Sequence, residues 1–387
     1  MECNMNYTFK IVIDENRTFS QKENDHIFDT MALLKDKMLR QKTLIESKSS
    51  NWDEAKRRVN EFEFVYSSSK RHFKLSNKKT ISRAYFKLWE ILRDFHTSIF
   101  SNINNRYTSC HIAEGPGGFI ECLVDYKSKY GLNLTKIFGI TLLMQSNNIE
   151  NRVPFWKINK QDCEKHNIFL NKKSSNIGDL YQMHCINKFV DRVGYQSVDL
   201  ITADGGFDFS VDFNKQEENF TRLFLSEICT ALLLQKKHGT FIVKVFDMFT
   251  LDTVCLVSIL YSLYSHVYIV KPFTSRPANS EKYLVCLDFK SHENFWGIIQ
   301  DIKSCICSKS KIMSTSLSSH FNPKVYARIF LYNVYYSNRQ ITYLKKTLNE
   351  ASSHEKKYSL SDNNEKLDKC LKWCAQYEID TTTKTRS

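Results

Sequence analysis

The sequence predicts an α/β fold built on a largely parallel sheet. From Tyr107 onward, short apolar runs alternate with longer stretches of helical periodicity, which is the order of strands and helices in βαβ units. Right-handed crossovers bring the carboxyl ends of parallel strands to one edge, where such proteins bind ligands. The apolar runs cover 109–113, 137–142, 198–203, 240–246, 266–270 and 282–288, and helical patterns fill 118–130, 217–236 and 250–264.

The length of 387 residues indicates one main domain with two flanking regions. We expect a helical and basic extension over 1–75, the main domain over 76–290, and a helical region with a polar tail over 291–387. Hydrophobic residues make up 42% of the chain, no apolar run is long enough to cross a bilayer, and the first residues lack a secretion signal. These features predict an intracellular protein.

Outside the alternating region the pattern is mainly helical. Apolar residues recur at helical spacing over 28–39 and 323–349, and residues 146–178 are polar enough to predict an irregular insertion. We expect the last thirty or so residues to fray, apart from an amphipathic piece over 367–374. Residues 81–95 predict a helix that Ser82 could cap, with Lys87 on its surface.

The formal net charge of +13 predicts attraction to polyanions, of which nucleic acid is the usual one. Charge alone does not separate RNA, DNA and acidic membrane. A basic cluster that includes Lys70 and Arg71 precedes the main domain and is either a solvated loop or an RNA-facing patch. The twelve cysteines show no zinc-ligand spacing, so we expect no metal site.

A glycine-rich turn, Ala113-Glu-Gly-Pro-Gly-Gly-Phe119, follows the first apolar run and opens a helix-like stretch. Glycines allow a backbone to approach a ligand closely, and a helix N-terminus offers unpaired N–H groups to it. The turn matches neither the dinucleotide nor the nucleotide phosphate motif. It is therefore either a cradle for another ligand or a turn without one.

Three charged residues stand at or near the ends of apolar runs. Asp204 ends one run before two glycines, Lys244 interrupts another, and Glu281 begins a third. A charge in a central strand is costly unless it is paired. A lysine beside carboxylates and a second cation could have a depressed pKa, provided that the cation and desolvation outweigh the carboxylates, and could then accept a proton from a hydroxyl. The alternative is an ion-pair network that only holds the sheet edge.

These motifs together resemble the FtsJ-like ribose 2′-O-methyltransferases. The resemblance covers about residues 80–290 and keeps the order of the motifs, and it is strongest to the enzymes that methylate the first transcribed nucleotide of capped mRNA in eukaryotes and large DNA viruses. The matching segments are Ser82-Arg-Ala-Tyr-Phe-Lys87, Ala113–Phe119, Ala203-Asp-Gly-Gly206, Thr240–Thr250 and Lys271-Pro-Phe-Thr-Ser-Arg-Pro-Ala-Asn-Ser-Glu-Lys-Tyr283.

The resemblance implies a Rossmann-like fold that uses S-adenosylmethionine, with a mostly parallel seven-stranded sheet flanked by helices. It implies a catalytic tetrad in which Lys244 is the general base, Asp204 and Glu281 tune it, and Lys87 orients the ribose hydroxyl and helps to depress the pKa of Lys244. The implied cofactor contacts are Ala113, Glu114, Gly115, Pro116, Gly117, Gly118, Phe119, Asp179 and Leu180, and Asn279 aligns with a substrate contact of the cap enzymes. Arg276 and the basic pair Lys70 and Arg71, which lies outside the resemblance, are further candidate RNA contacts.

Two departures from the family pattern concern the cofactor site. Glu114 stands where the cap enzymes usually carry a smaller residue. The run Gly139–Leu143 lacks the acidic residue that many other methyltransferases use to bind the ribose, and the cap enzymes lack this residue as well. A platform for the methylated guanine would be aromatic or cationic, and the sequence does not single one out.

The resulting hypothesis is a cap-1 enzyme whose substrate is capped mRNA, with other capping enzymes or an RNA polymerase as candidate partners and neither DNA nor membrane as a ligand. The alternatives are a 2′-O-methyltransferase for the second cap nucleotide, ribosomal RNA or transfer RNA, and an idle RNA-binding or scaffold subunit. A host enzyme would work in the nucleus, whereas a viral one would work in cytoplasmic virus factories or the virion.

Overall fold

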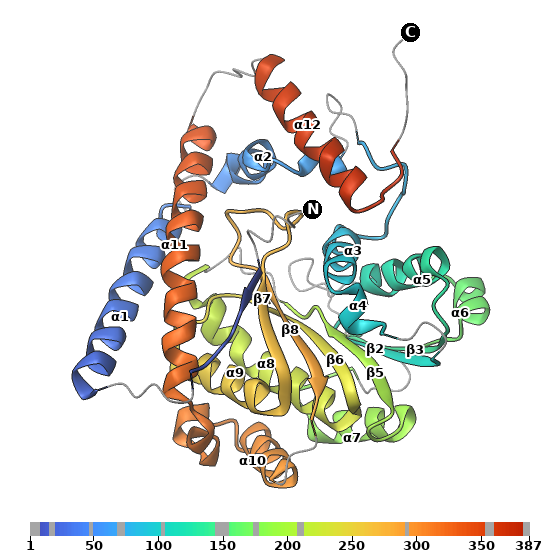
Figure 1. Cartoon of the computed structure of the whole chain (residues 1–387), viewed down its shortest axis with the longest axis vertical. Helices are drawn as coiled ribbons and strands as arrows, with labels where there is room; N and C mark the ends of the chain where they lie inside the picture. Colours follow the sequence, from blue (N-terminus) through green and yellow to red (C-terminus); the bar gives the residue numbers. More distant parts are fainter. Residues whose placement is uncertain are drawn as a thin grey trace.

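The molecule is organised around one twisted sheet, seen in Figure 1 of the computed structural model. Its strand order is β1-β7-β8-β6-β5-β2-β3-β4. The structure describes residues 8–14, 20–45, 49–67, 74–101, 105–143, 155–172, 178–206, 213–290, 294–352 and 360–381.

Five neighbouring strands, β2 to β6, run parallel, and β8 lies antiparallel between β6 and β7. The predicted α/β class with a mostly parallel sheet is therefore confirmed. The described chain carries eight strands rather than seven, since β1 and β4 are three-residue edge strands too short to form a readable pattern. The strands are β1 (Thr8–Lys10), β2 (Tyr107–Ile112), β3 (Leu134–Ile140), β4 (Ile168–Leu170), β5 (Val198–Ala203), β6 (Gln235–Val245), β7 (Tyr264–Val270) and β8 (Lys282–Phe289).

Helices cover both faces of the sheet, because alternate strand residues point into two separate apolar cores. One core lies between the sheet and the four helices α7, α8, α9 and α10, and it extends to α1 and α11. The other core lies between the sheet and the helices α3, α5 and α12. The helices of the main domain are α3 (Ala84–Asp94), α4 (His96–Ile99), α5 (Gly118–Tyr130), α6 (Lys160–His166), α7 (Met183–Val193), α8 (Gln216–Leu234), α9 (Leu251–Leu263) and α10 (Phe295–Ser308).

Helix α3 differs from its prediction in two ways. Its N-cap residue is Arg83 without a side-chain cap, so Ser82 does not cap it, and every residue from Tyr85 to Leu92 is buried. Lys87 is consequently a buried side chain and not a surface one. The segment predicted as an irregular insertion also contains α6 and β4, while residues 144–154 and 173–177 of it lie outside the described part.

Flanking helices pack against the main domain. Helix α1 begins at a capping box formed by Ser20 and Glu23, and α11 runs beside it (Figure 1). The amphipathic piece predicted over 367–374 lies in α12, where Cys370 and Trp373 are buried, and the expected fraying does not extend to Tyr377, which is buried as well. The flanking elements are α1 (Gln21–Thr43), α2 (Ser49–Val59), η2 (Glu63–Val65), η6 (Ile312–Ser314), η7 (Ser316–His320), α11 (Pro323–Ser352) and α12 (Leu360–Gln376), and a short η5 (Phe213–Lys215) precedes α8.

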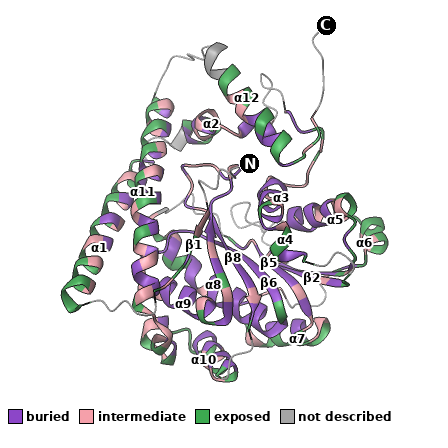
Figure 2. Cartoon of the chain, in the orientation of Figure 1, coloured by how far each residue is buried: buried purple, intermediate pink, exposed green. Residues whose placement is uncertain are grey.

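Burial follows this layering. Figure 2 shows the sheet and α8 buried and much of α1 and α6 exposed. Helix α8 is apolar on nearly all sides, which is typical of a helix enclosed between the sheet and other helices. Among the described helices, none is both long and apolar enough to span a bilayer.

Candidate active site

A cleft of about 740 Å³ opens at the carboxyl ends of the parallel strands. Its size is within the range of small-molecule sites, about 300–1,000 Å³. Its wall includes Ala113, Gly115 and Pro116 of the glycine-rich turn. It also includes the four predicted charged residues, Lys87, Asp204, Lys244 and Glu281.

The topology brings these four side chains together. Asp204 follows β5 and Lys244 lies near the end of β6, while the antiparallel β8 starts at the same edge and places Glu281 there. Lys87 comes from α3, which lies over the sheet. The sequence could predict the three strand-associated charges from pattern, but the position of Lys87 depends on helix packing.

Two lysine–carboxylate pairs form the centre of the site. Lys244 Nζ lies 3.2 Å from Asp204 Oδ1 and donates to the Asp204 carbonyl at 2.8 Å. Lys87 Nζ lies 2.7 Å from Glu281 Oε2. The four side chains are between 10% and 14% exposed, so each charge is largely desolvated and needs its partner.

The pKa of Lys244 is opposite to the predicted depression. Burial lowers the pKa of Lys244, but the carboxylates of Asp204 and Glu281 and the hydrogen bond to Asp204 outweigh burial, so the pKa lies above its ordinary value. Burial raises the pKa of Glu281, yet the cations of Lys87, Lys244 and Lys271 hold it well below its usual range. At neutral pH the resting site therefore holds Lys244 as an ammonium and Glu281 as a carboxylate.

Asp204 and Glu281 have further partners that fix their orientation. The Tyr283 hydroxyl donates to Asp204 Oδ1 at 3.0 Å, and the Ser275 hydroxyl donates to Glu281 Oε1 at 2.8 Å. Both carboxylates are thereby held by a hydroxyl in addition to a lysine. This arrangement presents the Lys244 amine to the cleft in one orientation.

A fifth ionisable residue near these pairs, Glu227 of α8, was not predicted from the sequence. Its side chain is 0% exposed and accepts from the Gly205 N–H at 3.1 Å. Burial raises the pKa of Glu227 to about 8, in spite of the nearby Lys244 cation. The sequence shows a glutamate among apolar residues of a predicted helix, but only the structure shows that this glutamate lies behind the turn that follows Asp204.

The glycine-rich turn separates ligand-facing residues from packing residues. Gly117 has φ 114° and forms the N-cap of α5, and a Cβ there would lie 2.8 Å from Ile158 Cδ1. Gly118 packs closely on the Ser82 side chain, since its Cβ would lie 2.1 Å from Ser82 Oγ. Gly115 and Pro116 are the part of this turn that borders the cleft with Ala113.

The contacts of the Glu114 side chain differ from the predicted cofactor contact. Its carboxylate accepts from the Phe119 N–H at 2.6 Å, and the side chain is buried at 3% exposure. It therefore occupies a helix N-terminal N–H that the sequence prediction left for a ligand. Burial raises the pKa of Glu114 well above its ordinary value. Glu114 is better described as a support for the turn, and the buried Phe119 as part of the core.

Asp179 and Leu180 are not among the described residues that border the cleft. The Asp179 carboxylate accepts from the Tyr181 N–H at 2.9 Å, and Leu180 is 4% exposed. The preceding Gly178 packs on the backbone of Thr141, where a Cβ would lie 2.3 Å from the carbonyl oxygen, and Thr141 itself borders the cleft. The turn thus abuts the end of β3 beside the cleft.

The predicted RNA contacts have different outcomes. Asn279 borders the cleft. Arg276 does not, because its guanidinium forms a buried ion pair with Glu63 of η2 at 2.8 Å, where the two side chains are 10% and 8% exposed. Arg276 therefore joins the loop between β7 and β8 to the N-terminal region and is not a free cation for RNA binding. Lys70 and Arg71 lie outside the described residues.

The N-terminal region supplies cleft residues that the sequence did not identify. Lys42 of α1 and Trp52, Asp53 and Lys56 of α2 border the cleft, as does Arg83. Lys56 Nζ lies 5.8 Å from the centre of the Trp52 ring and 2.6 Å from Asp53 Oδ1. A tryptophan one helical turn from a lysine is a weak signal in sequence, so only the packing of α2 over the site gives it meaning.

Within the described residues, no group of three or more His, Cys, Asp and Glu side chains is arranged to hold a metal ion. The cleft has the features of a cradle for an organic ligand instead. Gly206 leaves open space that a Cβ would fill at 3.1 Å from Lys244 Nζ. An open space in front of a paired lysine, next to a glycine-rich turn, can hold a small ligand against an amine.

Several known proteins resemble this chain in amino-acid sequence. The family model of FtsJ-like methyltransferases matches residues 80–289. The Cap-specific mRNA (nucleoside-2′-O-)-methyltransferase 2 of Drosophila melanogaster is 32% identical over 253 residues, which are 62% of this chain and 35% of that protein. The Cap-specific mRNA (nucleoside-2′-O-)-methyltransferase 1 of the same species is 36% identical over 186 residues, 48% of this chain and 22% of that protein.

The Cap-specific mRNA (nucleoside-2′-O-)-methyltransferase 1 of Trypanosoma brucei brucei is 29% identical over 210 residues, 54% of this chain and 53% of that protein. The chain spans between about a fifth and a third of the two Drosophila relatives. The family model, in contrast, covers more than half of the chain and includes the glycine-rich turn and all four paired charges. The chain belongs to the FtsJ-like methyltransferase family.

Proposed function

We propose that the chain is an S-adenosylmethionine-dependent methyltransferase that modifies the 2′-hydroxyl of the first transcribed nucleotide of capped mRNA. The observation that carries this proposal is the meeting of the Lys244–Asp204 and Lys87–Glu281 pairs in one cleft beside the glycine-rich turn. A bare ion-pair network would not need the open space that Gly206 leaves in front of Lys244.

Cofactor binding is assigned to the wall formed by Ala113, Gly115, Pro116 and Thr141. S-adenosylmethionine, when bound, supplies a methyl group that is already activated by the positive charge on its sulfur. The remaining requirement is to align an oxygen nucleophile and to remove its proton. Glu114 and Gly117 support this wall from behind by fixing the start of α5.

Lys244 is the proposed general base. Its ammonium form must first lose a proton, because the carboxylates raise its pKa. A second positive charge close to Lys244 in the cleft disfavours its ammonium form and makes the loss of this proton easier. With the cofactor bound, the neutral amine would accept the proton of the ribose 2′-hydroxyl, whose oxygen would take the methyl group as the sulfur–methyl bond breaks. Lys87 is held in place by its ion pair with Glu281 and orients the same 2′-hydroxyl.

The substrate assignment rests on the cleft wall and on the relatives. Lys56 and Arg83 border the cleft together with Trp52, and they provide cations and an aromatic ring for a nucleotide chain. The relatives carry the names of cap-specific mRNA methyltransferases 1 and 2. Capped mRNA is thus the proposed partner, and the enzyme would act wherever that RNA is made, in the nucleus or in a virus factory.

A second candidate is methylation of the second cap nucleotide. It is favoured by the matches to the type 2 enzymes of Drosophila melanogaster and Danio rerio, which are 32% and 33% identical. Both candidates share the base and the cofactor site. They differ only in which ribose the RNA path places in front of Lys244.

Methyl transfer to short RNAs that differ only at the 5′ end tests the proposal. Labelled methyl should appear on capped RNA, and nuclease digestion should place it on the first ribose. Label on the second ribose would support the second candidate. Equal labelling of capped and uncapped RNA would contradict both cap assignments and favour a ribosomal or transfer RNA substrate. Absence of donor binding would leave the scaffold alternative.

A further inference from the structure

All four residues of the segment Ala278–Glu281 border the cleft, yet the segment lies between β7 and β8 outside regular strand structure. A loop with this task needs restraints, since a misplacement of about 1 Å in a catalytic group costs about 10²-fold in rate. The restraints on this segment come from side chains on the side away from the cleft.

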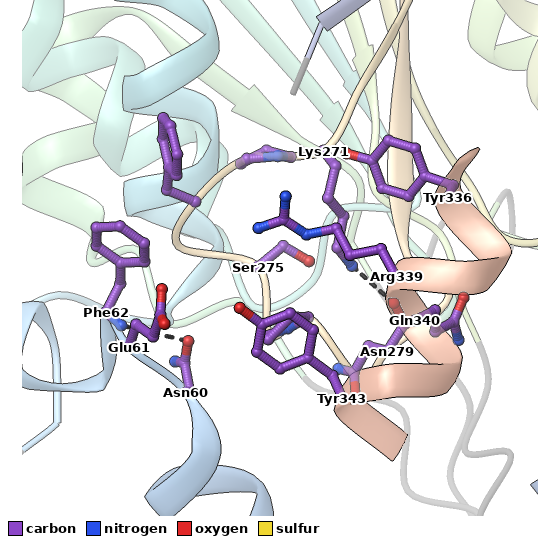
Figure 3. A pocket seen from close by; sticks show the side chains of 13 residues that line it. Asn60, Glu61, Phe62, Lys271, Ser275, Asn279, Tyr336, Arg339, Gln340 and Tyr343 are labelled. Atoms are coloured by element: carbon purple, nitrogen blue, oxygen red, sulfur yellow. Dashed lines mark hydrogen bonds between the residues drawn. The ribbon is translucent and has the colours of Figure 1, made fainter. Parts of the chain in front are cut away.

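Lys271 provides the first restraint. Its Nζ donates to the Asn279 carbonyl at 2.7 Å and to the Glu281 carbonyl at 2.6 Å, and the residue is 4% exposed. Both carbonyl groups are thereby satisfied by one buried amine from the start of the same loop. Figure 3 shows the Lys271 side chain directed toward Asn279, with the hydrogen bond between them drawn as a dashed line.

Gln340 of α11 provides the second restraint. Its Nε2 donates to the Ala278 carbonyl at 3.2 Å and to the Ser280 hydroxyl at 3.1 Å, and the residue is 4% exposed. Figure 3 shows Gln340 and Tyr343 on the helix that faces the loop. Gln340 lies outside residues 80–289, so the match to the family model does not include it.

The N-terminal region reaches the same point through Ser280. The Ser280 hydroxyl donates to Asp247 Oδ2 at 3.1 Å, and Lys42 of α1 lies 2.5 Å from that oxygen. The Lys42 and Asp247 side chains are 5% and 7% exposed. Ser280, next to Glu281 in the chain, therefore connects α1 and α11 to the catalytic loop.

Water reaches these bonds poorly, because Ala278 and Ser280 are only 7% and 4% exposed although both border the cleft. The cavity beside the loop that is lined by Lys271, Asn279, Gln340 and Tyr343 among others has a volume of only about 30 Å³, which has room for very few water molecules (Figure 3). Loss of the Gln340 amide would thus leave the Ala278 carbonyl poorly satisfied and its position less defined.

We propose that Gln340 is a positioning residue for methyl transfer. It fixes the backbone of Ala278–Glu281, so that the Glu281 carboxylate holds Lys87 beside the Lys244–Asp204 pair. Gln340 does not border the cleft and acts through the loop. This inference rests on the proposed function, because it assumes that Glu281 and Lys87 serve the reaction.

The test compares Gln340→Leu with Asn338→Leu in the full chain. Asn338 lies on the same helix but is exposed: its amide donates to the Val334 carbonyl of its own helix and accepts from the exposed Lys37 at 3.3 Å, so it does not contact the loop. Gln340→Leu should lower kcat on capped RNA about tenfold, while the KM for RNA and the Kd for S-adenosylmethionine stay within about twofold. Asn338→Leu should match the wild type in all three. A Gln340→Leu variant with unchanged kcat, or with a loss confined to KM, would overturn the proposal.

Ser280→Ala is the second variant, because it removes the hydroxyl that Gln340 contacts and leaves α11 intact. It should lower kcat in the same direction, and wild-type turnover by Ser280→Ala would count against the proposal. Hydrogen exchange gives a readout without turnover: peptides covering 277–284 should exchange faster in Gln340→Leu than in Asn338→Leu. Unchanged exchange would overturn the restraint itself. A wild-type chain that methylates no RNA but shows the exchange difference would contradict the proposed function and leave the restraint standing.

Discussion

At Lys244, burial and charge act in opposite directions on one amine. Burial lowers its pKa and the carboxylates of Asp204 and Glu281 raise it further than burial lowers it, so the resting amine is protonated. The same opposition acts on Glu227, where burial prevails and the pKa rises to about 8. One cluster thus contains a lysine that holds its proton and a glutamate that is protonated at neutral pH.

Glu227→Gln tests the protonation of this buried carboxyl. The folded-state pKa of about 8 lies above the unfolded value of about 4.5, so the folded state binds more protons between these pH values and loses stability as pH rises through them. Glutamine cannot ionise. Glu227→Gln should therefore gain stability relative to the wild type between about pH 4.5 and pH 8, by up to a few kcal/mol, measured by urea unfolding across that range. A pH-independent difference would show that Glu227 is already ionised when folded.

The elements show what could be predicted from sequence and why the rest could not. Strands of six or more residues and the helices between them have a readable period, whereas β1 and β4 have three residues each and none. Asp204, Lys244 and Glu281 were predictable because each stands at the end of an apolar run or within one. Lys87 was predicted only by resemblance, since its burial depends on the packing of α3.

The turn that starts α5 offers a test at the scale of an element. Gly117→Ala should destabilise the protein by about 1–3 kcal/mol, because φ 114° is strained for alanine and its Cβ meets Ile158. It should also weaken S-adenosylmethionine binding, measured by calorimetry, as the turn shifts. Gly131→Ala is the matched control: φ is 65° there and a Cβ meets open space, so a smaller loss of stability and no change in donor affinity are expected. Equal donor affinity in the two variants would contradict the assigned role of the turn.

Across the whole molecule, both flanking regions are tied to the loop that follows β7. Lys42 pairs with Asp247, which follows β6 and accepts from Ser280 of that loop, and Glu63 pairs with Arg276. The Trp373 indole N–H donates to Glu90 Oε2 at 3.1 Å, while the Phe273 N–H donates to the other oxygen of that side chain. These contacts join residues far apart in the chain, so no local pattern predicts them. The predicted boundaries at 75 and 290 therefore separate sequence patterns rather than independent parts of the site.

Arg276 distinguishes a structural tie from an RNA contact. Arg276→Leu alone leaves Glu63 buried without its cation and should destabilise the protein by about 3–5 kcal/mol, measured by urea unfolding. Replacing both residues, Arg276→Leu with Glu63→Leu, should recover most of that stability, since buried pairs are often replaceable by apolar residues. The double variant should also bind RNA like the wild type. Restored stability with lost RNA affinity would instead assign Arg276 to the substrate.

The most direct test of the central claim is the single-turnover rate of methyl transfer to the first ribose of capped RNA by Lys244→Met and by the wild type. Methionine keeps much of the volume of lysine but cannot accept a proton. The variant should bind S-adenosylmethionine with wild-type affinity and transfer the methyl group about 10²–10⁴-fold more slowly, the range expected for loss of a general base. A rate within a few-fold of the wild type would contradict the assignment of Lys244 as the base.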